Sequence, residues 1–240
     1  MSVADKLATI AANEKRVHEA GIEQGKQAEY DRFWDAYQEN GKRNFYQHGF
    51  ANQGWTDETF KPKYDLILGN GYSGNEMFKF SKITNIAESL EKCGVVLDTS
   101  KNFYFSSMLN GSVTTRMPVI NCTGVLANNT SCLQYMFLNA KAKTIDKMIV
   151  PEWAIFYNTF NNAADLENII FEGTIGQNGL NLQWSTKLSK ASIESIVGCL
   201  STTTSGLSIT LSKTAVNNAF TTDEWTALEQ TRPNWTISLV

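Results

Sequence analysis

An apolar pattern that recurs along the middle of the chain constrains the fold more than any other feature. Four residues begin the recurring units and lie 31, 28 and 24 positions apart: Met77, Met108, Met136 and Phe160. In the clearest unit, Leu166, Ile169 and Phe171 follow Phe160 at offsets of 6, 9 and 11 residues. These intervals are close to the period of about 20 to 29 residues found in leucine-rich repeats. Because no single unit can bury its apolar face, the pattern predicts units that stack on one another.

The other three units follow the same offsets less strictly. Their residues at 6, 9 and 11 positions after the anchor are Ile83, Ile86 and Glu88, then Thr114, Met117 and Val119, then Ala142, Ile145 and Lys147. The departures from a large apolar side chain are Glu88, Thr114, Ala142 and Lys147. The last two offsets of the pattern predict a short strand that sends alternate side chains inward. Each strand is expected to follow an Asn-rich turn, such as YMFLN or NTFNN.

Three of these segments resemble the BspA-like (treponemal-type) leucine-rich repeats, whose unit places an aromatic residue in a turn before an L-x-x-I-x-I/L-P run. The matching segments are TFNNAADLENIIFEGTIG, YMFLNAKAKTIDKMIVP and SSMLNGSVTTRMPVI, within residues 75–180. The leader (ADKLATIA…AEYDRFWDAYQ), the GWTDETFKPKYD segment and the ending (SKASIESIVGCL…NWTISLV) also resemble parts of repeat-bearing virion or surface proteins from prophages of gut Firmicutes.

The resemblance implies an α/β repeat fold, a degenerate leucine-rich-repeat solenoid with short strands, an N-terminal α-helix and an α+β C-terminal cap. The alternative is a coincidence among the short apolar strands of another β-rich fold. The expected parts are a helix over 1–40, an irregular aromatic-rich connector over 41–74, repeats over 75–184 and a cap over 185–240. A solenoid needs such a cap because its last unit would otherwise expose a core edge.

The first 40 residues are predicted to form a helix that ends at Asn40-Gly41. Leu7, Ile10 and Val17 form a sparse apolar stripe, which Gly21 and Gly25 interrupt at a cost of roughly 1 kcal/mol each. One interpretation is a coiled coil that oligomerises the protein or attaches it to other virion proteins. The other is a mobile amphipathic leader whose aromatic end packs on the following domain.

The connector and the cap have their own signals. A strand is expected over 64–68, and the Gly-rich GNGYSG (69–74) is expected to be a turn because it lacks the GK[ST] of a phosphate loop. In the cap, a helix is expected from Ser189, a strand over 207–212, a short helix over 213–220 and a helix with Thr222 as its N-cap. The alternating WTISLV (235–240) is expected to lie beside 207–212.

The residues that carry chemistry are sparse. The only histidines are His18 and His48, no nucleophile motif is present, and the four cysteines have no zinc spacing. No cofactor is therefore expected, and the protein is expected not to be an enzyme. Cys122 and Cys132 would pair in an oxidising setting, but reduced thiols are the favoured interpretation. The alternative is a cell-wall glycosidase that uses two carboxylates among Asp165, Glu167 and Glu172.

Charge and hydropathy limit the partners. A net charge of -3 gives no basis for binding nucleic acid. No stretch reaches the roughly 18 to 20 apolar residues of a membrane span, and the charged N-terminus does not resemble a secretory signal. We therefore expect assembly in a host cytoplasm and a place in the virion, with the bacterial cell surface as the alternative.

Binding is the expected activity. The solenoid implied by the resemblance would present outward strand residues, and PEWAIFYNTF adds two aromatic residues that either face solvent or plug the core. The candidate contact residues are Arg116, Lys147, Trp153, Tyr157, Asn168 and Glu172. The expected function is a non-enzymatic phage structural protein of the tail or baseplate, a homo-oligomer that recognises a host-surface glycan or protein. The alternatives are a capsid or tail decoration protein without receptor binding and a bacterial adhesin.

Overall fold

The computed structural model describes residues 3–40, 49–51, 54–68 and 74–240, with the side chains of the first helix described over 12–36. The chain forms two compact units, residues 1–40 and 41–240. The predicted GNGYSG turn falls mostly outside the described residues, as do the side chains of Leu7 and Ile10.

The first unit is one helix, α1 (Val3–Asn40), which ends at the predicted residue. It continues without a break through Gly21 and Gly25, beside which there is open space. Near its C-terminal end, Tyr30 and Phe33 meet the ring of Trp34 edge to face, at centroid distances of 6.0 and 5.1 Å. The apolar stripe of the first half therefore stays on one continuous helix.

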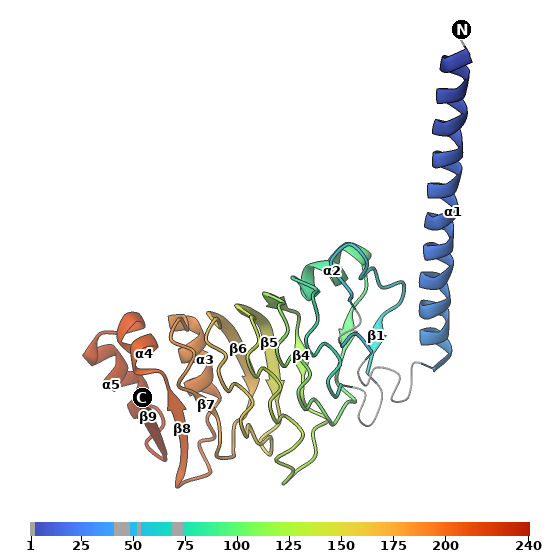
Figure 1. Ribbon diagram of the computed structural model, residues 1–240. Coiled ribbons are helices and arrows are strands. Elements are labelled where there is room, and N and C mark those ends of the chain that lie inside the picture. The colour runs from blue at the N-terminus through green and yellow to red at the C-terminus, as the bar shows by residue number, and fades with distance from the viewer. Residues whose placement is uncertain (1–2, 41–48, 52–53, 69–73) are drawn as a thin grey trace. The chain divides into compact units, whose positions relative to one another are not determined.

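The second unit contains four successive turns of nearly identical backbone shape. Each turn spans five residues and has a left-handed residue at both ends; these pairs are Glu76 and Phe80, Ser107 and Gly111, Tyr135 and Asn139, and Asn158 and Asn162. Asn and Gly tolerate this conformation better than other residues do. Backbone N–H groups join each turn to the next, as from Leu109 to the Met136 carbonyl at 2.8 Å. The turns thus lie side by side along the unit (Figure 1).

One short strand precedes the first of these turns and others follow the turns, and all of the pairings between strands are parallel. β1 (Leu66–Ile67) pairs with β2 (Leu97–Asp98). The central sheet contains β3 (Arg116–Met117), β4 (Ile120–Asn121), β5 (Thr144–Val150) and β6 (Asn168–Gly173), and β5 pairs with the other three. A third sheet has the order β7 (Asn181–Leu182), β8 (Leu207–Leu211) and β9 (Trp235–Leu239). The strand predicted over 64–68 is therefore shorter than expected and is confined to β1.

A register shift corrects the predicted offsets. Ile145 pairs with Ile169, but Met148 pairs with Phe171, so β5 holds one residue more than β6 between the two buried positions. Such a β-bulge places Met148 in the core, although the fixed offset of 11 falls on Lys147, and it explains why Lys147 departs from the apolar pattern. β4 keeps the register of β5, and Ile120 is buried where the offset predicted Val119.

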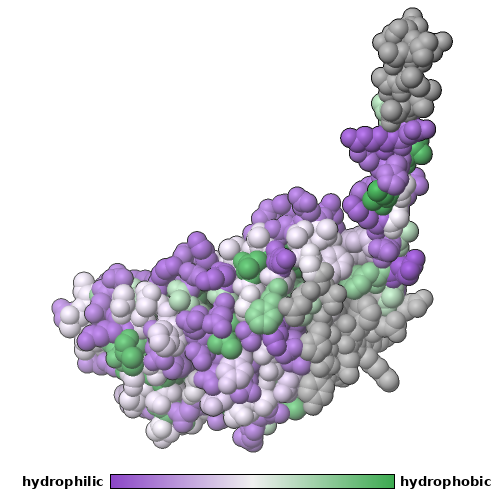
Figure 2. All heavy atoms as spheres, in the orientation of Figure 1, coloured by the Kyte–Doolittle hydropathy of each residue, from purple (hydrophilic) through white to green (hydrophobic). Residues whose placement is uncertain are grey.

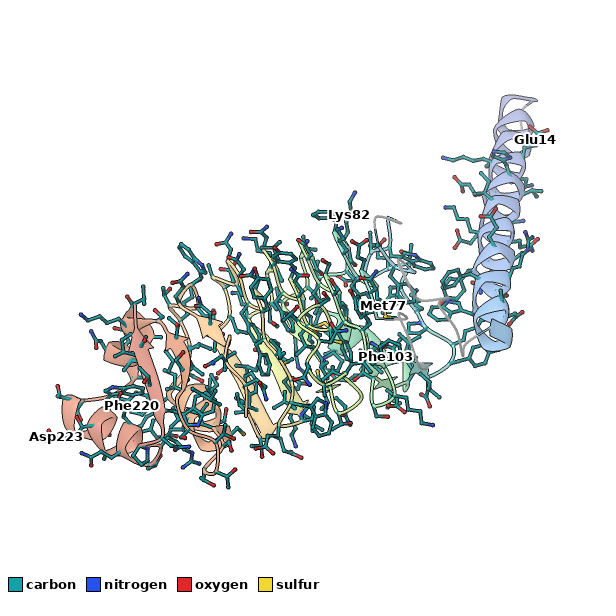
Figure 3. All side chains as sticks on the ribbon, turned by 90° about the horizontal axis from the view of Figure 1, so that it is seen from below. Glu14, Met77, Lys82, Phe103, Phe220 and Asp223 are labelled. Carbon is teal, nitrogen blue, oxygen red and sulfur yellow. The ribbon has the colours of Figure 1, made fainter. Side chains whose placement is uncertain are left out.

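The fourth anchor is also displaced by one position. The rings of Phe137 and Phe160 stack, with centroids 5.1 Å apart and planes within 2° of parallel. The left-handed residues of these two turns agree with this superposition, since 135 and 158 each precede the stacked ring by two positions. The spatial equivalent of Met136 is therefore Thr159, one position before the predicted anchor. The side chains at this position of the four turns, Met77, Met108, Met136 and Thr159, are buried in the interior. Met77 points inward, whereas Lys82 points to solvent (Figure 3).

Two short helices flank the central sheet. α2 (Ile86–Cys93), capped by Asn85, lies where the apolar repeat that begins at Met77 was expected to have a strand. Thr114, a polar residue at an apolar position of the repeat pattern, is fully buried beside this helix. Its hydroxyl accepts a hydrogen bond from the Ile86 N–H at 3.1 Å and donates one to the Arg116 carbonyl. The buried hydroxyl thus satisfies the first N–H of the helix. Ala142, another departure, is simply a small buried residue.

At the other edge of the sheet, α3 (Lys190–Cys199) replaces a further strand. Its Ser192 hydroxyl accepts from the Ile169 N–H at 2.9 Å, and its Ser195 hydroxyl accepts from the Phe171 N–H at 3.2 Å. Two serines one helical turn apart therefore satisfy the outer N–H groups of β6. An uncovered strand edge would otherwise be open to pairing with another chain.

The C-terminal cap follows the predicted order. In sequence, α4 (Lys213–Ala219) and α5 (Thr222–Gln230) connect β8 to β9. β9 pairs with β8 in parallel, which confirms the expected pairing. The N-cap of α5 is Thr221, not the predicted Thr222. Thr221 and Glu224 form a capping box, in which each side chain binds the backbone N–H of the other residue, and this reciprocal pair selects Thr221.

Candidate functional site

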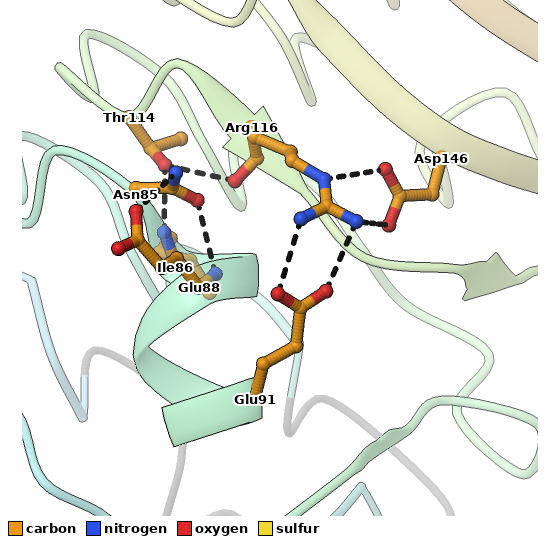
Figure 4. A network of polar contacts seen from close by, with 7 residues as sticks. All are labelled: Asn85, Ile86, Glu88, Glu91, Thr114, Arg116 and Asp146. Carbon is orange, nitrogen blue, oxygen red and sulfur yellow. Dashed lines mark hydrogen bonds and ion pairs between the residues drawn. The ribbon is translucent and has the colours of Figure 1, made fainter. Parts of the chain in front are cut away.

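The three charged residues predicted for the strand face all form ion pairs within the chain. Arg116 on β3 donates to both carboxylate oxygens of Asp146 on β5 at 2.8 Å and also contacts Glu91 on α2 at 3.0 Å (Figure 4). Its hydrogen bonds to Asp146 and then to Glu91 raise the pKa of the guanidinium above its ordinary value. Such bidentate pairs fix the side chain geometrically. Arg116 is therefore held between strands and is not a free cation.

Lys147 and Glu172 form the second pair of this face. The ammonium nitrogen of Lys147 on β5 lies 2.6 Å from a carboxylate oxygen of Glu172 on β6. The register shift described above places Lys147 on the outside of the sheet, where Glu172 faces it. Of the remaining predicted residues of this face, Asn168 is exposed. The structure thus brings Lys147 and Glu172 together as a salt bridge between strands.

Asp165, one of the three carboxylates named for the glycosidase alternative, is surrounded by positive charge. Asp165 lies between Lys187 and Lys141, at 3.1 and 3.2 Å, and the hydrogen bonds from these two lysines lower the pKa of its carboxyl group. A glycosidase acid needs a raised pKa. Asp165 therefore has the opposite electrostatic environment from a general acid.

Trp153 and Tyr157 both lie at the surface, which decides between the two interpretations left open by the sequence. Their residues are 44% and 49% exposed, whereas Phe156 and Phe160 of the same segment are 1% exposed and fill the core. The indole N–H of Trp153 donates to the carbonyl of Val125 at 2.7 Å. Trp153 is thus an exposed ring with a fixed edge.

Other hydrophobic residues on the surface are scattered. On the face drawn in Figure 2, hydrophobic residues of the second unit are separated by hydrophilic ones. Val17, the described member of the predicted oligomerisation stripe, is 68% exposed on α1. An exposed valine is available to a partner helix.

Two hollows lie elsewhere in the second unit, and in each of them a charged residue of the lining is hydrogen-bonded to backbone atoms of the chain. The first, of about 300 Å³, lies beside α2, where Asp57 accepts hydrogen bonds from the N–H groups of Thr84 and Asn85 and from the Thr84 hydroxyl. The second, of about 290 Å³, lies at the end of α3, where Arg232 donates to the carbonyls of Gly198 and Leu200 at 2.6 and 2.9 Å. These charged groups are committed to capping backbone atoms.

The arrangement of metal-binding side chains and thiols offers little further chemistry. Within the described ranges, no three side chains of His, Cys, Asp or Glu come together in a way that could hold a metal ion. The four cysteines are free, and burial raises the pKa of the Cys122 thiol. Cys122 is therefore a weak nucleophile in the folded protein.

Sequence reasoning missed the partners that hold the strand face. Asp146 and Glu91 were not among the candidate residues, although Asp146 lies 30 positions after Arg116, close to the repeat interval. Opposite charges separated by one repeat interval were the available signal, and Lys147 with Glu172 has the same form at 25 positions.

Comparison with known proteins yields no relative: no protein-family model, no curated protein and no solved structure matches this chain. In the part of the chain that the structure describes, no helix has an apolar stretch long enough to cross a bilayer.

Proposed function

We propose that this protein is a non-enzymatic phage structural protein of the tail or baseplate that recognises a host-surface glycan or protein. In this proposal the second unit is a degenerate leucine-rich-repeat solenoid closed by an α+β cap. Support comes from the turns joined by backbone hydrogen bonds and from the parallel register of β3, β5 and β6. The resemblance of the repeat segments to BspA-like proteins agrees with this arrangement.

One observation carries the proposal: Trp153 and Tyr157 are exposed on a segment whose neighbours fill the core. Aromatic side chains contribute large contact area at small entropic cost, and they dominate many binding surfaces. The two exposed aromatic residues lie close together in sequence, on a segment that the core holds in place.

In the same proposal, α1 is the segment that oligomerises the protein or attaches it to other virion proteins. It is 38 residues long, and Val17 is open to a partner. Leu7, Ile10 and Val17 recur at intervals suited to a helix–helix seam. The virion, assembled in the host cytoplasm, is the proposed location, and a bacterial surface is the alternative.

The test measures mass and binding on the full chain. Light scattering is expected to give an oligomer for the natural chain and a monomer for the variant Leu7→Asp, Ile10→Asp, Val17→Asp. A matched control, Lys15→Asp and Glu19→Lys, reverses a salt bridge of the same helix and is expected to leave the mass unchanged. Fluorescently labelled protein is then incubated with intact Gram-positive cells.

The outcomes separate the proposed functions. An oligomer that binds cells supports the recognition protein. An oligomer without saturable binding favours a decoration protein, and release of soluble sugar from the cell walls would indicate a glycosidase. A monomeric natural chain contradicts the role given to α1.

A further inference from the structure

The three loops that follow the buried strand positions have almost no charge. Segments 122–132, 151–162 and 174–186 contain a single charged residue, Glu152, in a chain that is 19% charged. The Glu152 carboxylate accepts a hydrogen bond from the Ser201 hydroxyl at 3.2 Å. The three loops instead carry many amide side chains, together with Trp153, Tyr157 and Trp184. A surface of this composition offers aromatic faces and neutral hydrogen-bonding groups.

The loops lie side by side and hold one another. Trp153 in the second loop donates to Val125 in the first at 2.7 Å. The N–H of Gly176 in the third loop donates to the Glu152 carbonyl in the second at 3.0 Å. A Cβ at Gly176 would lie 2.8 Å from the carbonyl oxygen of Glu152, so the third loop approaches the backbone before Trp153 very closely. The backbone of Trp153 is therefore fixed from one side and its ring from the other.

The first loop is equally rigid. A Cβ on Gly124 would lie 2.8 Å from the Asn102 carbonyl oxygen of the preceding turn, so only glycine fits there. Val125 is 4% exposed, and its N–H donates to the Cys122 carbonyl. Leu126, which directly follows Val125, is 45% exposed. The exposed side chain next to the Trp153 hydrogen bond is thus held on a fixed backbone.

From these contacts we propose that Trp153, with Leu126 beside it, is the stacking platform for a ring of a neutral carbohydrate. The inference rests on the proposed recognition function and names its ligand class. The apolar face of a sugar ring covers an aromatic ring, and its hydroxyls pair with amides placed around it. A ring held in advance loses little conformational entropy on binding.

The strand face is a poorer site for the same ligand. Its charges are already paired in Arg116 with Asp146 and in Lys147 with Glu172. A partner that bound there would have to desolvate or break these pairs. A neutral ligand that stacks on Trp153 meets no such cost. The platform is therefore assigned to the loops and not to the strands.

The test titrates the full-length protein with tetramers of glucose and of N-acetylglucosamine, and with polyglycerol phosphate as an anionic probe. Calorimetry and tryptophan fluorescence report binding. The expected result is saturable binding of a neutral tetramer that Trp153→Ala weakens at least about tenfold, as for a central aromatic contact. Leu126→Ser is expected to weaken binding by a smaller factor, because it keeps the Trp153 hydrogen bond.

Two further variants separate stacking from a merely structural role. Trp153→Phe loses the hydrogen bond to Val125 but keeps an aromatic ring, so binding is expected to fall less than in Trp153→Ala. Ile170→Ala removes a comparably exposed side chain from the strand face and is expected to bind like the natural protein. Thermal melts of all variants show whether each one is folded.

The inference is overturned if no neutral tetramer binds, if polyglycerol phosphate binds more tightly, or if folded Trp153→Ala binds undiminished. Binding to intact cells distinguishes this failure from that of the proposed function. Cell binding that survives Trp153→Ala leaves host recognition in place at another surface, and cell binding that protease treatment of the cells abolishes points to a protein ligand. Absence of both cell binding and tetramer binding contradicts both proposals.

Discussion

Replacing Ser192 by alanine tests whether α3 completes the hydrogen bonding of the β6 edge. The Ser192 hydroxyl is the acceptor for the N–H of Ile169, and both residues are 0% exposed. Water cannot easily replace the lost acceptor at such a site. Ser192→Ala therefore leaves a buried backbone donor unsatisfied.

The expected cost follows from this burial. An unsatisfied buried donor costs about 1 to 3 kcal/mol, and the higher helix propensity of alanine returns a few tenths of a kcal/mol. We expect a net loss of about 2 kcal/mol for Ser192→Ala. Ser195→Ala should lose about 1 kcal/mol, because its bond to Phe171 is longer, at 3.2 Å, and only partly buried.

Thermal unfolding and amide exchange measure the loss. For a domain of this size, about 2 kcal/mol corresponds to a melting temperature lower by roughly 4 to 8 °C. The control is Thr226→Ala on α5, whose hydroxyl donates only to its own helix at Thr222, and its melting temperature should hardly change. A melting temperature of Ser192→Ala that equals that of the control, with unchanged protection of the Ile169 amide, would refute the edge-capping role.

Three other predictions concern separate parts of the chain. Gly21→Ala with Gly25→Ala should raise the helical signal and melting temperature of α1, since each change favours the helix by roughly 1 kcal/mol and open space surrounds both sites; an unchanged circular dichroism melt contradicts this. Hydrogen bonds from Lys190 and Thr221 lower the pKa of Glu224 to about 2. This contribution to α5 is fully present above the ordinary pKa near 4.5 and is lost as the pH falls toward 2, so urea midpoints should drop over this range and Glu224→Gln should make that drop smaller. Cys122 should react with a thiol reagent at pH 8 only after unfolding, and rapid labelling of the native chain would contradict its burial.

Much of the local structure is predictable because it depends on neighbours in sequence. Ser189 before an apolar face predicts α3, and the alternation in 207–212 and 235–240 predicts β8 and β9. The end of α1 at Asn40 is also encoded locally. The one error of capping, Thr222 in place of Thr221, is a shift of a single position.

The register of the strands is less accessible to sequence reasoning. A fixed offset cannot accommodate the extra residue of β5, so the offset of 11 falls on Lys147 and Val119, whereas Met148 and Ile120 occupy the buried positions. The bulge is defined by pairing with β6, which lies more than 20 residues further along the chain. The same holds for Thr114, whose hydroxyl finds its partner in Ile86 of the preceding turn.

The sequence by itself determined where the apolar residues recur, which segments of the leader and the C-terminal cap are helices or strands, and that reactive side chains are few. Those properties follow from composition and from the short periodicities of strands and helices, which local sterics and burial impose. Only the tertiary structure decided that Arg116 and Lys147 are paired, that Ser192 covers a strand edge, and that Trp153 faces solvent with its ring held by Val125. Each of these depends on a hydrogen bond or ion pair between segments that are distant in sequence. Such contacts are set by packing and not by local propensity.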